Sequence, residues 1–180
     1  MQRTRNLILT ALFAALTAVG AFLRIPTPTS SFTLQVFFTA MAGVLLGSRR
    51  GAASQTVYVL LGLVGLPVFT SGGGPGVLLQ PTGGFLPGMI AMAWVTGRIT
   101  ERRGHSFGTI CLACAVGLLA LYAVGLPWMH GILAGYLQQD WSVQQTLVSG
   151  MLVFLPWDLG KLLLAAVLCS RIRPRLQHIL

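Results

Sequence analysis

The chain has 180 residues, of which 54% are hydrophobic and only 8% are charged, and its mean hydropathy is +0.78. A soluble domain carries about 25% charged residues, so this composition excludes most soluble enzymes and indicates that lipid surrounds most side chains. The charge is basic, with 12 Lys and Arg against 3 Asp and Glu. Because the basic residues stand in short clusters between apolar runs, they fit the positive-inside rule of membrane proteins better than a nucleic-acid-binding surface.

Apolar runs between charges and helix-breaking residues define six candidate membrane spans. They cover residues 7–23, 34–47, 52–69, 85–97, 107–126 and 147–169. The second and fourth are shorter than the ~20 residues that a helix needs to cross a ~30 Å hydrocarbon core, so each either extends into flanking residues or ends in a cavity. No cleavage site follows the first run, which is therefore interpreted as a retained span. We expect an all-α integral membrane protein, a single transmembrane domain over residues 1–180 with six helices.

The distribution of charge orients these spans. A cytoplasmic N-terminus puts ten of the twelve basic residues on that side, with Arg24 outside and Lys161 within the last span. This bias predicts that both termini are cytoplasmic. The outer segments are then 24–33, 70–84 and 127–146, and the first two are rich in Gly, Pro and Thr. Irregular backbone at membrane depth is tolerated where it lines a cavity, so we expect a ligand cavity that faces outward.

Two ionisable residues stand well inside a span, namely Asp158 and Lys161. Three positions apart on a helix they share a face, and each costs roughly 2.5 to 3.5 kcal/mol if it faces lipid at the bilayer centre. One interpretation is an ion pair that merely holds the helix in place. We favour a ligand site, because the pair lies toward the side where the glycine-rich segments converge.

Neutral polar and aromatic side chains near the outer ends of the spans form a second candidate set. Amides and hydroxyls beside an apolar cavity suit an uncharged polar ligand, although helix capping is an equal alternative for the threonines and interhelical contact an alternative for the glutamines. Phenylalanines there are candidates for an apolar wall, or for ordinary core and lipid-facing positions. The set consists of Thr33, Gln35, Gln80, Thr82, Phe69 and Phe85.

The sequence contains no recognisable catalytic or metal-binding set. The glycine run at 72–76 lacks the Gly-Lys-Ser/Thr of a phosphate-binding loop, and the three histidines are scattered. We therefore predict that the chain is not an enzyme and that it holds no metal or cofactor of its own. An intramembrane enzyme with Asp158 as acid or base is disfavoured, because no second catalytic group accompanies it.

Small residues repeat every four positions in the first span, at Ala11 with Ala15 and at Ala14 with Ala18. Such a stripe lets another helix pack closely. Packing within the bundle and docking of a partner membrane protein are equally good interpretations of this face.

Five segments together carry a resemblance to a known family. They read Phe-Thr-Leu-Gln-Val-Phe-Phe at 32–38, Ala-Gly-Val-Leu-Leu-Gly-Ser-Arg-Arg-Gly-Ala at 42–52, Gly-Leu-Val-Gly-Leu-Pro-Val-Phe at 62–69, Pro-Thr-Gly-Gly-Phe-Leu at 81–86, and Asp158 with Lys161. In this order the chain, from about residue 4 to 172, closely resembles the BioY family. Its members are biotin-specific substrate-binding (S) components of energy-coupling-factor (ECF) transporters.

The resemblance implies a six-helix bundle, in the plasma membrane of a prokaryote, that captures biotin from outside. Import then requires partners, a transmembrane coupling (T) protein and two cytoplasmic ATPases that use ATP. Ala11 and Ala15 fall on the alanine motif by which S components contact the T protein.

The resemblance also implies a biotin site. Asp158 and Lys161 fall on the family's Asp-x-x-Lys, while Thr82, Gly83 and Gly84 fall on its Pro-Thr-Gly-Gly loop. A carboxylate suits the ureido N–H groups of biotin, and an ammonium suits either that carboxylate or the ligand.

Arg24, in an outer segment, is a candidate partner for the anionic tail of biotin. The alternatives are a stand-alone carrier of biotin or another small solute that works without ATPases, and the same fold with a different vitamin.

Overall fold

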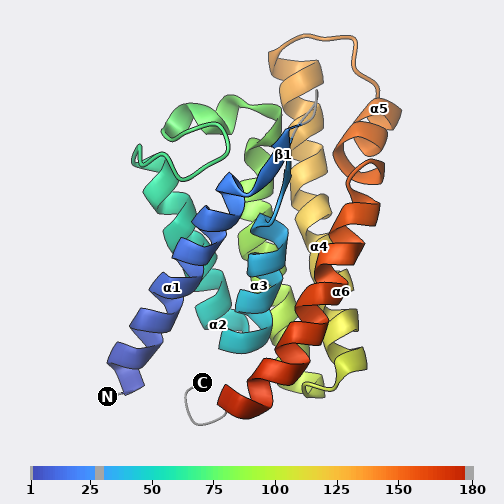
Figure 1. Cartoon of the computed structure of the whole chain (residues 1–180). Coiled ribbons are helices and arrows are strands. Elements are labelled where there is room, and N and C mark those ends of the chain that lie inside the picture. Colours follow the sequence, from blue (N-terminus) through green and yellow to red (C-terminus); the bar gives the residue numbers. More distant parts are fainter. Residues whose placement is uncertain (1, 27–30, 177–180) are drawn as a thin grey trace.

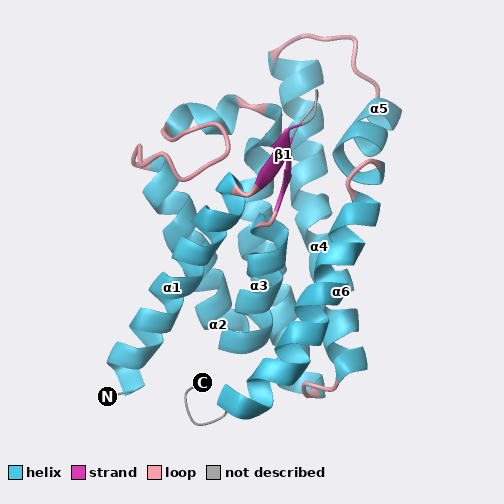
Figure 2. Ribbon diagram, in the orientation of Figure 1, coloured by secondary structure: helices cyan, strands magenta, loops and turns pink. Residues whose placement is uncertain are grey.

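The computed structural model describes residues 2–26 and 31–176, and this part of the chain is mostly helical (Figures 1 and 2). Within it, five helices have 18 residues or more, and α5 has only five. The helices are α1 (Gln2–Phe22), α2 (Gln35–Leu63), α3 (Phe85–Arg103), α4 (Phe107–His130), α5 (Val143–Leu147) and α6 (Leu155–Ile172). The predicted count of six transmembrane helices is therefore not confirmed. Residues 27–30 of the predicted outer segment 24–33 lie outside the described residues.

The count differs from the expected one because α2 folds back on itself and contains most of the second and third predicted spans. At Gly47 the backbone has a φ of 82° inside α2, a left-handed conformation that glycine adopts without steric cost. The Thr39 hydroxyl donates to Gln55 Oε1 across this turn at 3.1 Å. The two legs of α2, before and after Gly47, therefore run antiparallel.

A carboxylate from α3 caps the second leg of α2. Ser48 donates from its N–H to Glu101 Oε1 at 2.7 Å and from its hydroxyl to Glu101 Oε2 at 2.8 Å. Arg98, one turn earlier on α3, lies 3.7 Å from the same carboxylate. A negative charge at a helix N-terminus satisfies free N–H groups and opposes the helix dipole. The cap explains how the helix resumes within one residue of the turn.

The helices pack around the α2 hairpin. It contacts α1, α3 and α6, while α4 contacts α3 and α6. Close approach depends on small residues, as is usual between membrane helices: a Cβ atom at Gly97 would lie 2.3 Å from the Ser48 nitrogen. Three helical stretches of the described residues are long and apolar enough to cross a membrane, Gln2–Phe22, Phe107–Tyr136 and Val143–Arg175.

The end of the bundle opposite the first and last described residues carries irregular structure (Figure 1). Strands β1 (Arg24–Pro26) and β2 (Ser31–Thr33) pair antiparallel there, so the fold is not purely α-helical. Paired extended segments satisfy backbone groups where the chain turns back from α1 toward α2. Two 3₁₀ turns, η1 (Pro75–Leu79) and η2 (Pro81–Gly84), precede α3.

The third predicted outer segment, 127–146, is largely helical. Helix α4 continues through Pro127 and passes into a π-helical turn, η3 (Gly131–Tyr136). A second π-helical turn, η4 (Val148–Leu152), joins α5 to α6. The last predicted span thus begins as α5 and η4, and Pro156 falls in the first turn of α6 as expected.

Candidate binding pocket

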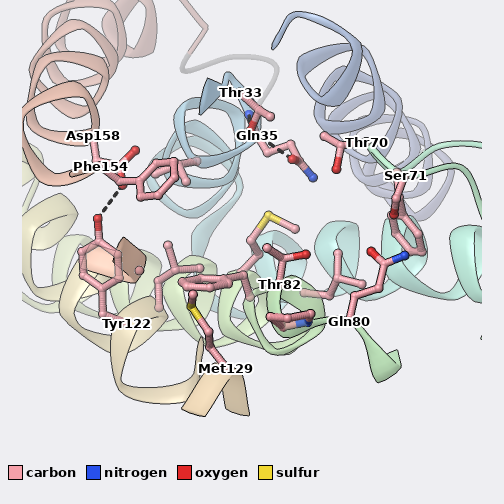
Figure 3. A pocket seen from close by; sticks show the side chains of 18 of the residues that line it. Thr33, Gln35, Thr70, Ser71, Gln80, Thr82, Tyr122, Met129, Phe154 and Asp158 are labelled. Carbon is pink, nitrogen blue, oxygen red and sulfur yellow. Dashed lines mark hydrogen bonds between the residues drawn. The ribbon is translucent and has the colours of Figure 1, made fainter. Parts of the chain in front are cut away.

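A pocket of about 460 Å³ lies at the strand-bearing end of the bundle. Its walls come from the β hairpin, the segment between α2 and α3, and helices α2, α3, α4 and α6 (Figure 3). The structure brings most of the predicted site residues together around it, although they are scattered through the sequence. Those that line it are Arg24, Thr33, Gln35, Phe69, Gln80, Thr82, Phe85, Asp158 and Lys161.

The charged pair forms one end of the pocket. Asp158 is 4% exposed, and its Oδ1 lies 2.6 Å from the Lys161 ammonium. Asp158 Oδ2 accepts a hydrogen bond from the Tyr122 hydroxyl at 2.6 Å (Figure 3). The ammonium also donates to the Thr33 carbonyl at 2.9 Å, which ties β2 to α6. Asp158 is buried and Lys161 partly buried, and each charge is hydrogen-bonded, as charges withdrawn from water need to be.

Tyr122 is the main site residue that sequence reasoning missed. It is 3% exposed on α4 and donates to Asp158. A single phenol in a long apolar helix has no periodic or charge signal that distinguishes it from a packing residue. Thr70, Ser71 and Phe154 also line the pocket without having been predicted; the first two follow Phe69 directly in the sequence.

A second polar group lies at the other end of the pocket. Thr70, Ser71 and Gln80 gather there, away from Asp158 and Tyr122 (Figure 3). The Arg24 guanidinium donates to the Thr70 carbonyl, so this cation belongs to the same end. The pocket therefore has polar groups at both ends, and between them lie Gln35 and Thr82 as well as apolar side chains such as Met129.

Thr33 and Gln35 make local and interhelical hydrogen bonds and also line the pocket. The Thr33 hydroxyl accepts a hydrogen bond from the backbone N–H of Gln35 at 3.4 Å and donates to Gln35 Oε1 at 3.0 Å. The Gln35 amide donates to the Tyr58 hydroxyl at 2.8 Å, across the α2 hairpin. Both side chains still line the pocket, so the local contacts position them rather than remove them from it.

Gly83 and Gly84 do not line the pocket and serve close packing instead. A Cβ atom would lie 2.5 Å from the Val77 carbonyl oxygen at Gly83 and 2.2 Å from the Trp128 Cβ at Gly84. The Trp128 indole also donates to the Leu78 carbonyl at 3.1 Å. Gly83 therefore lets η2 lie against η1, and Gly84 lets it lie directly against α4.

The alanine stripe of α1 divides between two faces. Ala11 and Ala15 are exposed, whereas Ala14 is 3% exposed and Ala18 is partly buried. Because successive residues are about 100° apart around a helix, Ala14 lies about 60° from Ala11 and turns toward the bundle. The exposed face of α1 therefore includes Ala11 and Ala15 but not Ala14.

Among the described residues, no group of three or more His, Cys, Asp or Glu side chains is placed to hold a metal ion. The fold and the pocket define a class, a helical membrane protein with a pocket that has polar groups at both ends.

Comparison with known proteins places the chain more narrowly. The BioY family model matches residues 1–178, and the chain belongs to this family. It is 41% identical over 172 residues to a protein of Lysinibacillus sphaericus named probable biotin transporter BioY, covering 95% of this chain and 88% of the relative. It is 38% identical over 170 residues to the biotin transporter BioY of Thermotoga maritima, covering 94% of this chain and 96% of the relative.

A solved structure of another protein has a similar fold. The crystal structure of the S-component for biotin from an ECF-type ABC transporter superposes with a TM-score of 0.84 at 27% identity, covering 96% of this chain and 93% of that one. These relatives are named as transporters and not as enzymes. The chain is therefore a membrane protein of a transporter family.

Proposed function

We propose that this chain is the biotin-binding S component of an ECF-type importer in the plasma membrane of a prokaryote. The observation that carries the proposal is the buried Asp158–Lys161 pair at one end of the pocket, in a chain whose relatives are named biotin transporters. Intramembrane charges that face a cavity usually serve a ligand or ion pathway. The relation to an S component for biotin supports the same conclusion.

The two-ended pocket suits the chemistry of biotin. The ureido ring meets Asp158, which accepts from its N–H groups, while Lys161 pairs with that carboxylate or donates to the ligand. The anionic tail reaches the end where Arg24 lies. Phe69 and Phe85 enclose the sulfur-containing ring between these ends. A volume of about 460 Å³ lies within the range of about 300 to 1,000 Å³ usual for small-molecule sites.

The proposed membrane topology follows from the α2 hairpin. When the two legs of α2 are counted separately, the chain has six spans in a single domain. The first and last described residues lie at the same end of the bundle, away from the pocket (Figure 1). The predicted cytoplasmic basic clusters belong to that end, at the start of α1, the α2 turn, the end of α3 and the end of α6. Both termini are then cytoplasmic, and the pocket faces outward.

Binding is tested by isothermal titration of biotin into the purified chain and its variants Asp158→Asn and Lys161→Ala. Removing one partner of a buried charge pair costs about 2 to 5 kcal/mol, so we expect affinity to fall about 30-fold or more in each. Asp140→Asn, which makes the same chemical change at an exposed position, is the matched control. Near-unchanged affinity in both pocket variants would refute the site, and absence of binding by the unmodified chain would refute the ligand.

In the proposed import cycle, the exposed face of α1 at Ala11 and Ala15 docks on the T protein, and the ATPases of the partner module supply the energy. Ala15→Trp should abolish ATP-driven uptake and leave biotin affinity unchanged, because the bulky side chain blocks docking and points away from the pocket. Leu163→Trp, on an exposed position of α6, is the control. Loss of binding together with uptake in Ala15→Trp would make α1 structural instead.

A stand-alone carrier differs from this proposal in one measurable property. Proteoliposomes that contain only this chain should bind biotin without accumulating it, whether or not ATP is present. Uptake by such vesicles would favour the carrier and refute the need for a partner module.

A further inference from the structure

A cluster of polar side chains lies in the interior of the bundle, outside the pocket. Thr17, Thr39, Ser54 and Gln55 are each 0% exposed. Burying such groups is costly unless all of them are hydrogen-bonded, and an apolar core would serve packing alone. Their presence between membrane helices therefore calls for a role beyond packing.

The cluster is centred on Gln55, whose side-chain amide connects three helical segments. Its Nε2 donates to the Thr17 hydroxyl of α1 at 3.1 Å and to Ser54 at 3.2 Å. Its Oε1 accepts from Thr39, on the first leg of α2, at 3.1 Å. The Thr17 hydroxyl donates onward to the Phe13 carbonyl at 2.8 Å. Gln55 thus uses both of its donors, and it ties α1 to both legs of the α2 hairpin.

The position of Thr17 determines which way α1 faces. Two residues correspond to about 200° around an α-helix, so Thr17 and Ala15 point in nearly opposite directions. In the structure Thr17 is fully buried and Ala15 is exposed. A hydrogen bond that holds Thr17 against α2 therefore also holds Ala15 outward. Apolar packing specifies the rotation of a helix less sharply, because it has no preferred donor or acceptor direction.

The same two legs carry pocket contacts one helical turn away. Gln35 lies four residues before Thr39, and Tyr58 lies three residues after Gln55, so each pair shares a helix face. Gln35 donates to Tyr58 and lines the pocket. The α2 hairpin therefore carries a pocket contact and an α1 contact on adjacent turns.

We propose that Thr17 and Gln55 are positioning residues for partner docking: their hydrogen bond fixes the rotation of α1 on the α2 hairpin so that the Ala11 and Ala15 face stays outward. This inference rests on the proposed function, in which that face meets the T protein. The hydrogen bond acts on docking to the T protein and not on biotin binding, because neither Thr17 nor Gln55 lines the pocket. Loss of the bond leaves biotin binding intact and impairs the step that needs an oriented α1.

The test compares Thr17→Val, which keeps the shape and removes the hydroxyl, with Thr17→Ser, which restores it. Thr56→Val is the matched control, because the Thr56 hydroxyl donates within its own helix, to the Ala52 carbonyl at 3.0 Å. Spin labels at Leu12→Cys on α1 and Leu60→Cys on α2, both exposed, report the orientation of α1 through their distance distribution. The native cysteines are replaced by serine for this measurement.

We expect Thr17→Val to bind biotin within about twofold of the unmodified chain, to broaden the distance distribution, and to lower ATP-driven uptake at least about fivefold, the lower range of coupling between sites. Thr17→Ser and Thr56→Val should behave as the unmodified chain does. A narrow, unchanged distribution in Thr17→Val overturns the proposal, as does loss of biotin binding in that variant, which would make the cluster a general stability element. Failure of the proposed function appears instead as absence of biotin binding by the unmodified chain, and the distance measurement remains decisive in that case.

Discussion

Tyr122→Phe removes a single oxygen from the charged end of the pocket and leaves the ring in place. The lost contact is the 2.6 Å hydrogen bond to Asp158 Oδ2. A carboxylate has about four acceptor positions, and the structure occupies one on each oxygen, with Tyr122 and Lys161. The remaining positions are available to a ligand. In the proposed site we therefore expect the Tyr122 hydroxyl to leave room for biotin and to fix the direction in which Asp158 presents its free lone pairs.

Hydrogen bonds to charged groups contribute about 1.5 to 3 kcal/mol, and Asp158 is almost fully buried, so solvent does not replace the lost donor. We expect the loss to divide between the two properties that depend on an oriented carboxylate. Thermal stability of the ligand-free chain should fall, and biotin affinity should fall about tenfold, which corresponds to about 1.4 kcal/mol.

Differential scanning fluorimetry and isothermal titration in the same detergent measure the two effects. Tyr136→Phe provides the matched control, because the Tyr136 ring is 61% exposed. If Tyr122→Phe binds biotin with unchanged affinity and melts at the same temperature, Tyr122 does not orient Asp158. Tighter binding would mean that the hydroxyl occupies a position that the ligand needs.

Two further predictions concern packing and pH. Gly84→Ala should destabilise the chain by about 1 to 3 kcal/mol, the usual cost of overpacking. The added Cβ would lie 2.2 Å from the Trp128 Cβ, whereas the Gly84 φ of −66° suits any residue. An unchanged melting temperature would contradict this prediction. Burial, followed by the charge of Arg173, lowers the pKa of His105 from 6.5 to about 4, although Glu101 acts in the opposite direction. The unfolded chain binds a proton between these pH values and the folded chain does not, so stability should fall as pH is lowered from 6.5 to 4. The melting temperature of His105→Gln should fall less over that pH range than that of the unmodified chain. If both melting temperatures fall equally with pH, His105 is not the cause.

The sequence predicted the charged part of the pocket because charges inside an apolar chain are rare and costly. Asp158 and Lys161 stood out on that ground alone, and their i, i+3 spacing correctly placed them on one face. The same argument could not find Tyr122, because a phenol is compatible with an apolar helix and its partner lies 36 residues away. Residues that act through a neighbour on another helix become visible only when the helices are placed together.

Some helix boundaries could likewise be predicted from the sequence and others could not. The start of α3 at Phe85 and of α4 at Phe107 agree with the predicted spans, since Gly, Pro and charged residues mark them. The predicted spans left residues 48–51 between them, yet the helix resumes at Ser48 because Glu101 from α3 caps it. A cap supplied by a residue 53 positions away leaves no local signal in the sequence.

The length of the first leg of α2 bears on what the pocket can hold. From Gln35 to the residue before Gly47 the leg has 12 residues, and at 1.5 Å per residue it is about 18 Å long. A hydrocarbon core is ~30 Å thick, so in the proposed orientation about 12 Å of depth beyond this helix is filled by the pocket and the β hairpin. One more turn of helix, ~5 Å, would occupy much of that space. In the proposed orientation, the residue at which this helix begins therefore limits the depth that is left for a ligand.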